Sequence, residues 1–254
     1  TPGVYKLSNG VAAPITTFTE RNKRVNSVYG TATLSYANKI FLDVTGRNDW
    51  SSTLPSGNNS FFYPSVSTSF ILSDLLRLPE QISFAKLRAS WAQVGNDTDP
   101  YKTAKYYNTS AFPGSASVSP TLYNARFKPE ISNSIEVGLD WRMFKQRFGL
   151  DLAFYNNITR NQILDVPMDQ TTGYTKATMN SGKVRNRGIE LQLDGTPVKT
   201  KNFTWNSTFT WAKNYNKVLS LAAGLTDGQT IAYTGGTNCA LIAKVGGSIG
   251  DIYG

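Results

Sequence analysis

Hydrophobic and polar residues alternate with a period of two in the stretch of residues 133–157. Over residues 135–143 every odd position is apolar, and the positions between them are charged or glycine. After residues 144–147 the alternation restarts, with apolar residues at the even positions of 148–154. Side chains of a strand point to opposite faces in turn, so each half predicts a strand with one apolar and one polar face. The short link predicts an antiparallel hairpin.

The same alternation recurs along the chain and predicts eight strands of about nine to twelve residues: 28–36, 40–47, 62–72, 83–94, 135–143, 148–157, 183–194 and 203–211. The connections after the first, third, fifth and seventh strands are short, with one helical turn expected within residues 73–82. The connections after the other strands are long and rich in turn residues, and residues 46–60, 95–132 and 156–181 are predicted as loops. The region after residue 211 is expected to be mostly loop.

This pattern predicts an all-β fold, an antiparallel transmembrane β-barrel segment. Such barrels have short turns on one side and long loops on the other, and a tilted strand of roughly 9–11 residues crosses the bilayer. Aromatic residues near the strand ends suit the membrane interfaces. A soluble β-sandwich explains the period of two but not the alternating loop lengths. No apolar run approaches the roughly 18 residues of a membrane helix.

Composition narrows the possible functions. The 254 residues suffice for one large all-β domain, and the net charge of +9 comes from scattered basic residues, so we expect no nucleic-acid partner. The chain has no histidine and one cysteine, Cys239, and it shows no catalytic, cofactor or metal constellation. We therefore expect no enzyme. Both ends of the sequence suggest an internal piece of a longer protein.

Several stretches resemble the SusC/RagA family of TonB-dependent outer-membrane transporters. The matching stretches are LDVTGRNDWSSTLP, FYPSVSTSFIL, KLRASWAQVGNDTDPY, KPEISNSIEVGLD, YNNITRNQIL, GKVRNRGIELQL and VGGSIGDIYG. The resemblance runs from about residue 28 to the end.

The resemblance implies a barrel of 22 strands filled by an N-terminal plug, with residues 1–254 as part of its wall and the plug and remaining strands absent. It also implies a location in the outer membrane of a Gram-negative bacterium, in contact with outer-membrane lipid. The expected partners are a SusD-like surface lipoprotein that caps the barrel, TonB acting through the plug, and an oligosaccharide or peptide substrate. The expected activity is active import of that substrate.

Two groups of side chains are candidates for contacts. The residues predicted to face the lumen lie on the polar faces of the strands: Arg47, Arg88, Glu136, Asp140, Arg142 and Glu190. The candidates for contact with substrate or lid are aromatic residues expected in loops, which could equally pack the loops internally: Trp50, Tyr106, Tyr107, Phe112 and Tyr123.

Four motifs have a chemical and a structural interpretation. The segment 46–50 (GRNDW) carries sugar-binding residue types, but a turn held by Asn48 and Asp49 is favoured. The segment 95–99 (GNDTD) is rich in oxygen ligands but lacks the spacing of a calcium loop. Carboxylates on the same face of one strand are candidates for a glycosidase pair, yet they also occur on ordinary lumen walls: Glu136, Asp140, Glu190 and Asp194. A cluster of cations could face lipid phosphates or an acidic plug: Lys183, Arg185 and Arg187.

Two functions from other classes remain open at this point. A passive porin would show the same strands without plug or lid. A soluble all-β adhesin or carbohydrate-binding module would bury its apolar strand faces and dissolve without detergent.

Overall fold

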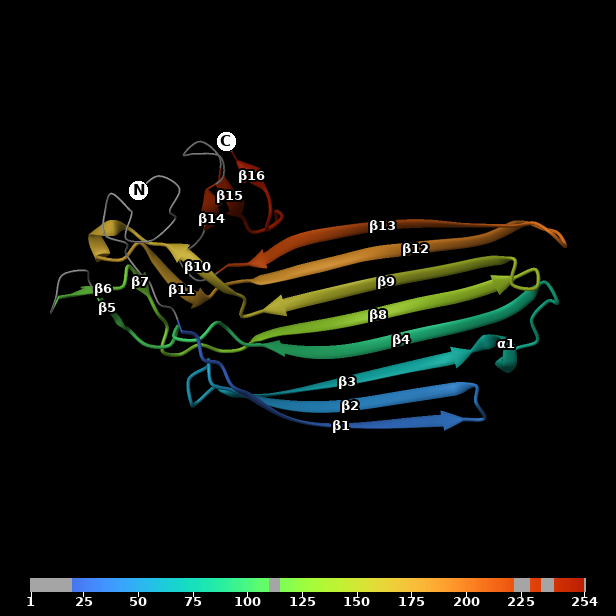
Figure 1. Cartoon of the computed structure of the whole chain (residues 1–254), viewed down its shortest axis with the longest axis horizontal. Coiled ribbons are helices and arrows are strands. Elements are labelled where there is room, and N and C mark those ends of the chain that lie inside the picture. Colours follow the sequence, from blue (N-terminus) through green and yellow to red (C-terminus); the bar gives the residue numbers. More distant parts are fainter. Residues whose placement is uncertain (1–19, 110–114, 222–228, 234–239, 254) are drawn as a thin grey trace, which may run out of the picture.

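The structure, a computed structural model, describes residues 20–109, 115–221, 229–233 and 240–253. Its main feature is one antiparallel sheet of eight long strands lying side by side (Figure 1). In sheet order these are β1 (Val25–Tyr36), β2 (Ile40–Ser51), β3 (Ser60–Ile71), β4 (Ile82–Asn96), β8 (Glu130–Met143), β9 (Phe148–Arg160), β12 (Lys183–Lys199) and β13 (Thr204–Ser220). In the described part of the chain the sheet stays open, with β1 and β13 as its edges. The predicted all-β fold and its eight strands are confirmed.

Tight links join the strands in pairs at one end of the sheet, the short-turn end (Figure 1). Ala37 and Asn38 between β1 and β2 have positive φ angles of 51° and 55°, and the Lys39 amide donates to the Tyr36 carbonyl at 2.9 Å. Left-handed backbone of this kind reverses the chain within few residues. The single turn α1 (Leu72–Leu75) links β3 and β4. The alternation of short and long connections is confirmed except around β3, where residues 52–59 link β2 to β3 and the longer segment 72–81 links β3 to β4.

The long strands have 12 to 17 residues and exceed the predicted lengths. The loop predicted over 46–60 was wrong for its first residues, because β2 continues to Ser51 and β3 begins at Ser60. Likewise β13 runs to Ser220 through a region predicted as loop. Near the loops both faces of a strand carry polar residues, so the alternation disappears. The backbone hydrogen bonds between the strands do not depend on this alternation, so the strands continue.

Short strands occupy segments that were predicted as loops, at the opposite, long-loop end. They form three small sheets: β5 (Tyr107–Thr109) with β6 (Ala116–Val118); β7 (Thr121–Leu122), β11 (Lys176–Asn180) and β10 (Ile163–Pro167); and β14 (Gln229–Tyr233), β15 (Ala240–Ala243) and β16 (Ile252–Tyr253). A 3₁₀ turn, η2 (Gln170–Thr172), lies between β10 and β11. Elements of two to five residues are too short for a periodic pattern to reveal them.

The eight-stranded sheet has two chemically different faces. On one face, which we call the apolar face, large hydrophobic residues remain exposed, among them Val28, Leu34, Ile135, Phe154 and Trp211. Soluble proteins rarely leave such an area uncovered. No helix in the described ranges is long and apolar enough to cross a membrane. The only buried hydrophobic clusters among the described residues lie at the long-loop end, such as Leu54, Phe61 and Phe127.

Candidate functional site: the polar face of the sheet

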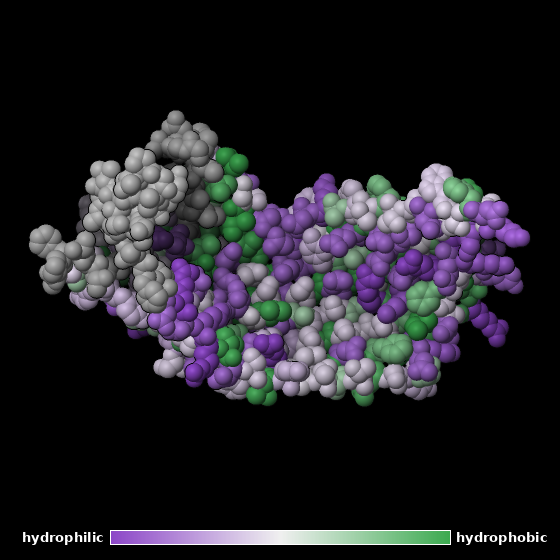
Figure 2. All heavy atoms as spheres, viewed as in Figure 1, coloured by the Kyte–Doolittle hydropathy of each residue, from purple (hydrophilic) through white to green (hydrophobic). Residues whose placement is uncertain are grey.

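Residues paired across neighbouring strands project from the same face of a sheet. The strand register therefore puts every predicted lumen-facing residue on the face opposite the apolar one, which we call the polar face: Arg47, Arg88, Glu136, Asp140, Arg142 and Glu190. Hydrophilic residues form a band across the middle of the sheet on the side in view in Figure 2. The structure thus brings the predicted set onto one surface.

Arg88 on β4 is the centre of an ion network on the polar face. Its Nη1 and Nη2 atoms donate to the two carboxylate oxygens of Asp151 on β9, at 3.0 and 2.7 Å. Its Nε lies 3.9 Å from a carboxylate oxygen of Glu136 on β8. A bidentate arginine–carboxylate pair fixes both side chains in one geometry, so this network links three strands.

Arg142 on β8 forms a second network nearer the short-turn end. Its Nε donates to Asp140 Oδ1 at 2.8 Å, and its Nη1 lies 3.5 Å from Asp194 Oδ2 on β12. Both carboxylates therefore share one guanidinium. A glycosidase has one protonated and one ionised carboxyl group flanking the bond that it cleaves. Here one arginine contacts both carboxyl groups. Three of the four candidate carboxylates thus lie within 4 Å of an arginine: Glu136, Asp140 and Asp194.

A hollow of about 300 Å³ opens beside the Arg88 network. Its polar lining side chains come from strands β4, β8, β9, β12 and β13: Arg88, Glu136, Asp151, Glu190, Gln192 and Thr210. Glu190 forms no ion pair with any cation in the described ranges. The hollow offers hydrogen-bond donors and acceptors of both charge signs, which suits a polar, uncharged or zwitterionic ligand better than an apolar one.

The GRNDW segment is part of strand β2, so the predicted turn is wrong. Asp49 is buried, and its two oxygens accept hydrogen bonds from Arg47 Nε at 2.8 Å and from the Tyr63 hydroxyl at 2.5 Å. The Arg47 guanidinium also lies 5.9 Å from the centre of the Tyr63 ring. The motif thus ties β2 to β3 through side chains on the polar face.

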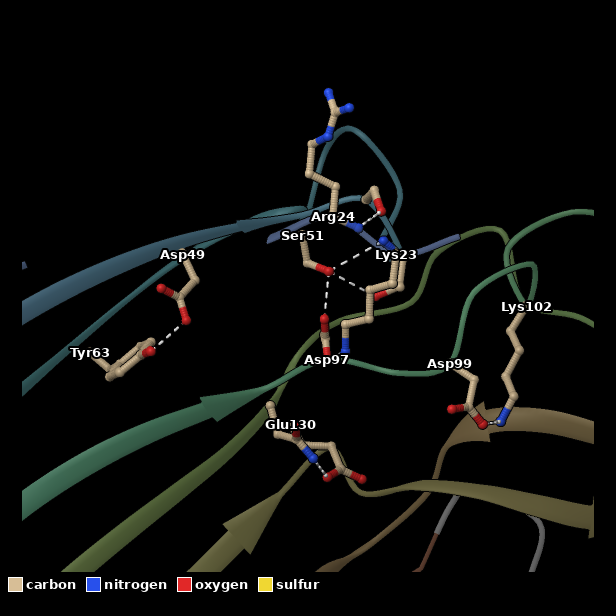
Figure 3. Close-up of polar contacts among 12 residues, drawn as sticks. Lys23, Arg24, Asp49, Ser51, Tyr63, Asp97, Asp99, Lys102 and Glu130 are labelled. Atoms are coloured by element: carbon tan, nitrogen blue, oxygen red, sulfur yellow. Dashed lines mark hydrogen bonds and ion pairs between the residues drawn. The ribbon is translucent and has the colours of Figure 1, made fainter. Parts of the chain in front are cut away.

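At the long-loop end, Asp97 joins distant segments of the chain (Figure 3). One carboxylate oxygen is 2.6 Å from Lys23 Nζ, and the other accepts a hydrogen bond from Ser51 Oγ at 2.5 Å. Asp99 pairs separately with Lys102 at 3.2 Å. In the described ranges no three His, Cys, Asp or Glu residues gather closely enough to hold a metal ion. Both carboxylates of the oxygen-rich segment 95–99 thus pair with lysines.

The aromatic candidates do not form one surface. Trp50 lies in β2, and the register puts it on the apolar face rather than in a loop. Tyr106 packs edge-to-face on Tyr101 with ring centres 6.0 Å apart, while Tyr107 is 74% exposed. Tyr123 is half-buried. Phe112 and Cys239 lie outside the described residues.

The sequence did not predict the anchoring roles of Asp151 and Asp97, although both hold networks together in the structure, and Asp97 was considered only within the oxygen-rich segment 95–99. For Asp151 a signal was present, because it occupies a polar-face position in the alternation of 148–154. For Asp97 there was none, since its partners come from segments 74 and 46 residues away in the chain.

Comparison with known proteins agrees with this architecture. A family model described as TonB dependent receptor-like, beta-barrel, matches residues 3–248. The TonB-dependent receptor P26 of Formosa agariphila is 33% identical over 207 residues, which make up 78% of this chain and 21% of that protein. The TonB-dependent receptor SusC of Bacteroides thetaiotaomicron is 26% identical over 230 residues, or 82% of this chain and 22% of SusC. The chain spans about a fifth of the length of these relatives.

Solved structures share the fold. The RagAB peptide transporter superposes with a TM-score of 0.81 at 22% identity, covering 97% of this chain and 27% of that chain. The siderophore receptor PirA from Pseudomonas aeruginosa gives 0.53 at 15% identity, covering 86% and 38%. With the open eight-stranded sheet and its two unlike faces, these matches show that the chain belongs to the TonB-dependent receptor-like β-barrel family and is a segment of such a barrel.

Proposed function

We propose that the protein containing this chain actively imports an oligomeric nutrient, a glycan or a peptide, across the outer membrane of a Gram-negative bacterium. In this proposal the apolar face of the sheet contacts lipid and the polar face lines the barrel of 22 strands. The observation that carries it is the segregation of the two faces together with the family match over residues 3–248. The family is one of transporters and receptors rather than enzymes.

The similarity to SusC at 26% identity supports a SusD-like lipoprotein as the lid over the long-loop end. The plug that would transmit the pull of TonB lies outside these residues. The role of the chain described here is to supply wall and loops. The ion networks of Arg88 and Arg142 hold the wall rigid, while the hollow beside Arg88 supplies polar contacts along the import route.

The first test uses the full-length protein purified from membranes. We expect extraction to require detergent and a lipoprotein to co-purify, detected by intact-mass measurement. Substrate uptake by cells that depend on the protein should stop when TonB is deleted. Uptake that persists without TonB would indicate a passive porin. A protein that dissolves without detergent would indicate a soluble adhesin or sugar-binding module.

A second test addresses the hollow. Glu190→Gln removes a negative charge beside the hollow. The control Lys201→Gln removes a positive charge from an exposed turn at the short-turn end of the sheet. We expect the first variant to change the uptake rate severalfold at unchanged protein level and the second to leave it unaltered. Equal uptake by both variants would place the import route away from the hollow.

A further inference from the structure

The charged residues of the eight long strands are sorted by sign between the two faces. Every Asp and Glu of these strands lies on the polar face, by the register of the sheet. The charged residues on the apolar face are all cations, and they lie on three neighbouring strands, from the middle of the sheet to its long-loop end. We call them the basic patch: Arg160, Lys183, Arg185, Arg187, Lys213 and Lys217.

Within the basic patch, like charges stand directly opposite each other. Arg185 pairs with Lys217 of β13, and Lys183 pairs with Arg160 of β9. Like charges in directly opposed positions destabilise a sheet. In the described parts of the chain none of the six cations forms an ion pair with a carboxylate. The sheet therefore holds a positive charge that an external anion would neutralise.

The position of the basic patch relative to the hydrophobic residues narrows the kind of anion. Ile189 pairs with both Phe154 and Lys213, and Arg187 pairs with Tyr215, so the patch lies directly beside exposed apolar side chains. Ile189 and Phe154 remain 40% and 48% exposed, and Lys213 lies 5.1 Å from the ring centre of Tyr215. An anion at this level has an apolar region directly beside it. A lipid headgroup meets that condition, because its acyl chains cover the apolar residues.

We propose that the basic patch binds the phosphate groups of phosphorylated lipids in the outer leaflet of the outer membrane. This rests on the proposed membrane location. Along β12 the cations are spaced by about 7 Å, and directly paired positions on neighbouring strands are about 5 Å apart, so more than one cation can reach the same phosphate. The guanidinium groups of Arg185 and Arg187 match phosphate oxygens with two parallel hydrogen bonds. An acidic plug inside the barrel is not the partner, because the patch lies on the opposite face.

The test uses the full-length transporter, stripped of lipid in detergent and then offered lipid A or the same lipid A after phosphatase treatment. Native mass spectrometry measures how much of each lipid stays bound. The test variant combines Arg185→Gln with Arg187→Gln. The matched control combines Lys145→Gln with Lys201→Gln, two exposed cations at the short-turn end. We expect wild type and control to retain phosphorylated lipid A, and the test variant to retain it roughly tenfold less.

Equal retention of the two lipid forms by the wild type, or unchanged retention by the test variant, would overturn the inference. Displacement of lipid A by inorganic phosphate at the same concentration would also overturn it, because the site would then recognise the free anion. TonB-dependent uptake is measured on the same variants. Loss of lipid binding with intact uptake contradicts only this inference, whereas bound lipid without TonB-dependent uptake contradicts the proposed function.

Discussion

The side chain of Arg88 on β4 lies across Gly138 on β8 to reach Asp151 on β9, two strands away. A Cβ atom at position 138 would collide with the Arg88 Nε. Arg142 likewise lies over Gly149 on its way to Asp194. Glycine at the intervening strand thus lets a long side chain lie flat on the polar face and connect strands that share no backbone hydrogen bonds.

At a third glycine, Gly188, an added methyl group would meet rigid backbone as well as a flexible side chain. Tyr155 lies over Gly188 and donates its hydroxyl proton to Asn214 at 3.2 Å, but a Cβ atom at 188 would also come within 2.6 Å of the Lys213 backbone carbonyl. We expect Gly188→Ala to lower the free energy of unfolding by about 1–3 kcal/mol, as overpacking does. Gly138→Ala should cost about 1 kcal/mol or less, because the Arg88 side chain can move aside. Thermal unfolding of both full-length variants in detergent measures the difference, and equal losses would contradict it.

The Arg88–Asp151 pair is suited to a double-mutant cycle. Its two side chains are 34% and 32% exposed, so solvent weakens their attraction. We expect Arg88→Gln and Asp151→Asn to be coupled by roughly 1 kcal/mol in the free energy of unfolding. The control cycle combines Arg88→Gln with Asp43→Asn, because no ion pair joins Arg88 and Asp43 in the described structure. Strict additivity of Arg88→Gln and Asp151→Asn would show that the pair does not stabilise the wall.

Asp97 and Asp99 are close in sequence but differ in their surroundings. The Asp97 side chain is 10% exposed and satisfies Lys23 and buried Ser51, whereas Asp99 is 68% exposed. Asp97→Ala should destabilise the protein by about 1–3 kcal/mol, because it leaves buried polar groups short of a partner. It should also speed proteolysis near residue 23. Asp99→Ala should stay within about 0.5 kcal/mol of wild type. Indistinguishable digestion of the two variants would contradict the anchoring role of Asp97.

Opposite outcomes are expected for a lysine placed on the two faces in the middle of the sheet. Leu152 lies on the apolar face and is 39% exposed, whereas Gln192 lies on the polar face beside the hollow. Leu152→Lys should reduce the stability of the folded protein in lipid by about 2–4 kcal/mol, the cost of a lipid-facing charge at mid-depth. Gln192→Lys should be tolerated. Urea unfolding in vesicles compares them, and a tolerated Leu152→Lys would contradict the assignment of the lipid-facing side.

The β10–β11 hairpin should weaken in acid. Burial alone raises the pKa of Asp165, but hydrogen bonds from Lys176 and Thr178, each 2.6 Å long, outweigh it and hold the pKa below the usual 3.8. A folded-state pKa below the unfolded one adds stability that is complete above pH 3.8 and is lost as the pH falls through the folded value. Hydrogen exchange over residues 163–180, corrected for intrinsic rates, should show less protection in acid. Asp165→Asn should remove most of this dependence, and a persistent one would point to another group.

The pattern of side chains predicted the number of long strands, the short and long connections and the two faces. It also put residues such as Arg88, Glu136 and Glu190 on one surface before their contacts were known. It failed where polar residues occupy both faces, as in the second half of β2, and therefore misplaced Trp50 in a loop. It also did not decide whether the cations of β12 face lipid phosphates or an acidic plug.

The sequence by itself determined which way each side chain of a strand points, because the period of two is a local property of extended backbone. The tertiary structure alone decided which side chains meet. Arg88 and Asp151 are 63 residues apart, and Lys183 stands opposite Arg160 only in this register. Register is set jointly by turns, strand lengths and neighbouring strands, and a shift of one residue would exchange the faces. Contacts across strands are therefore a property of the assembled sheet and not of any single stretch.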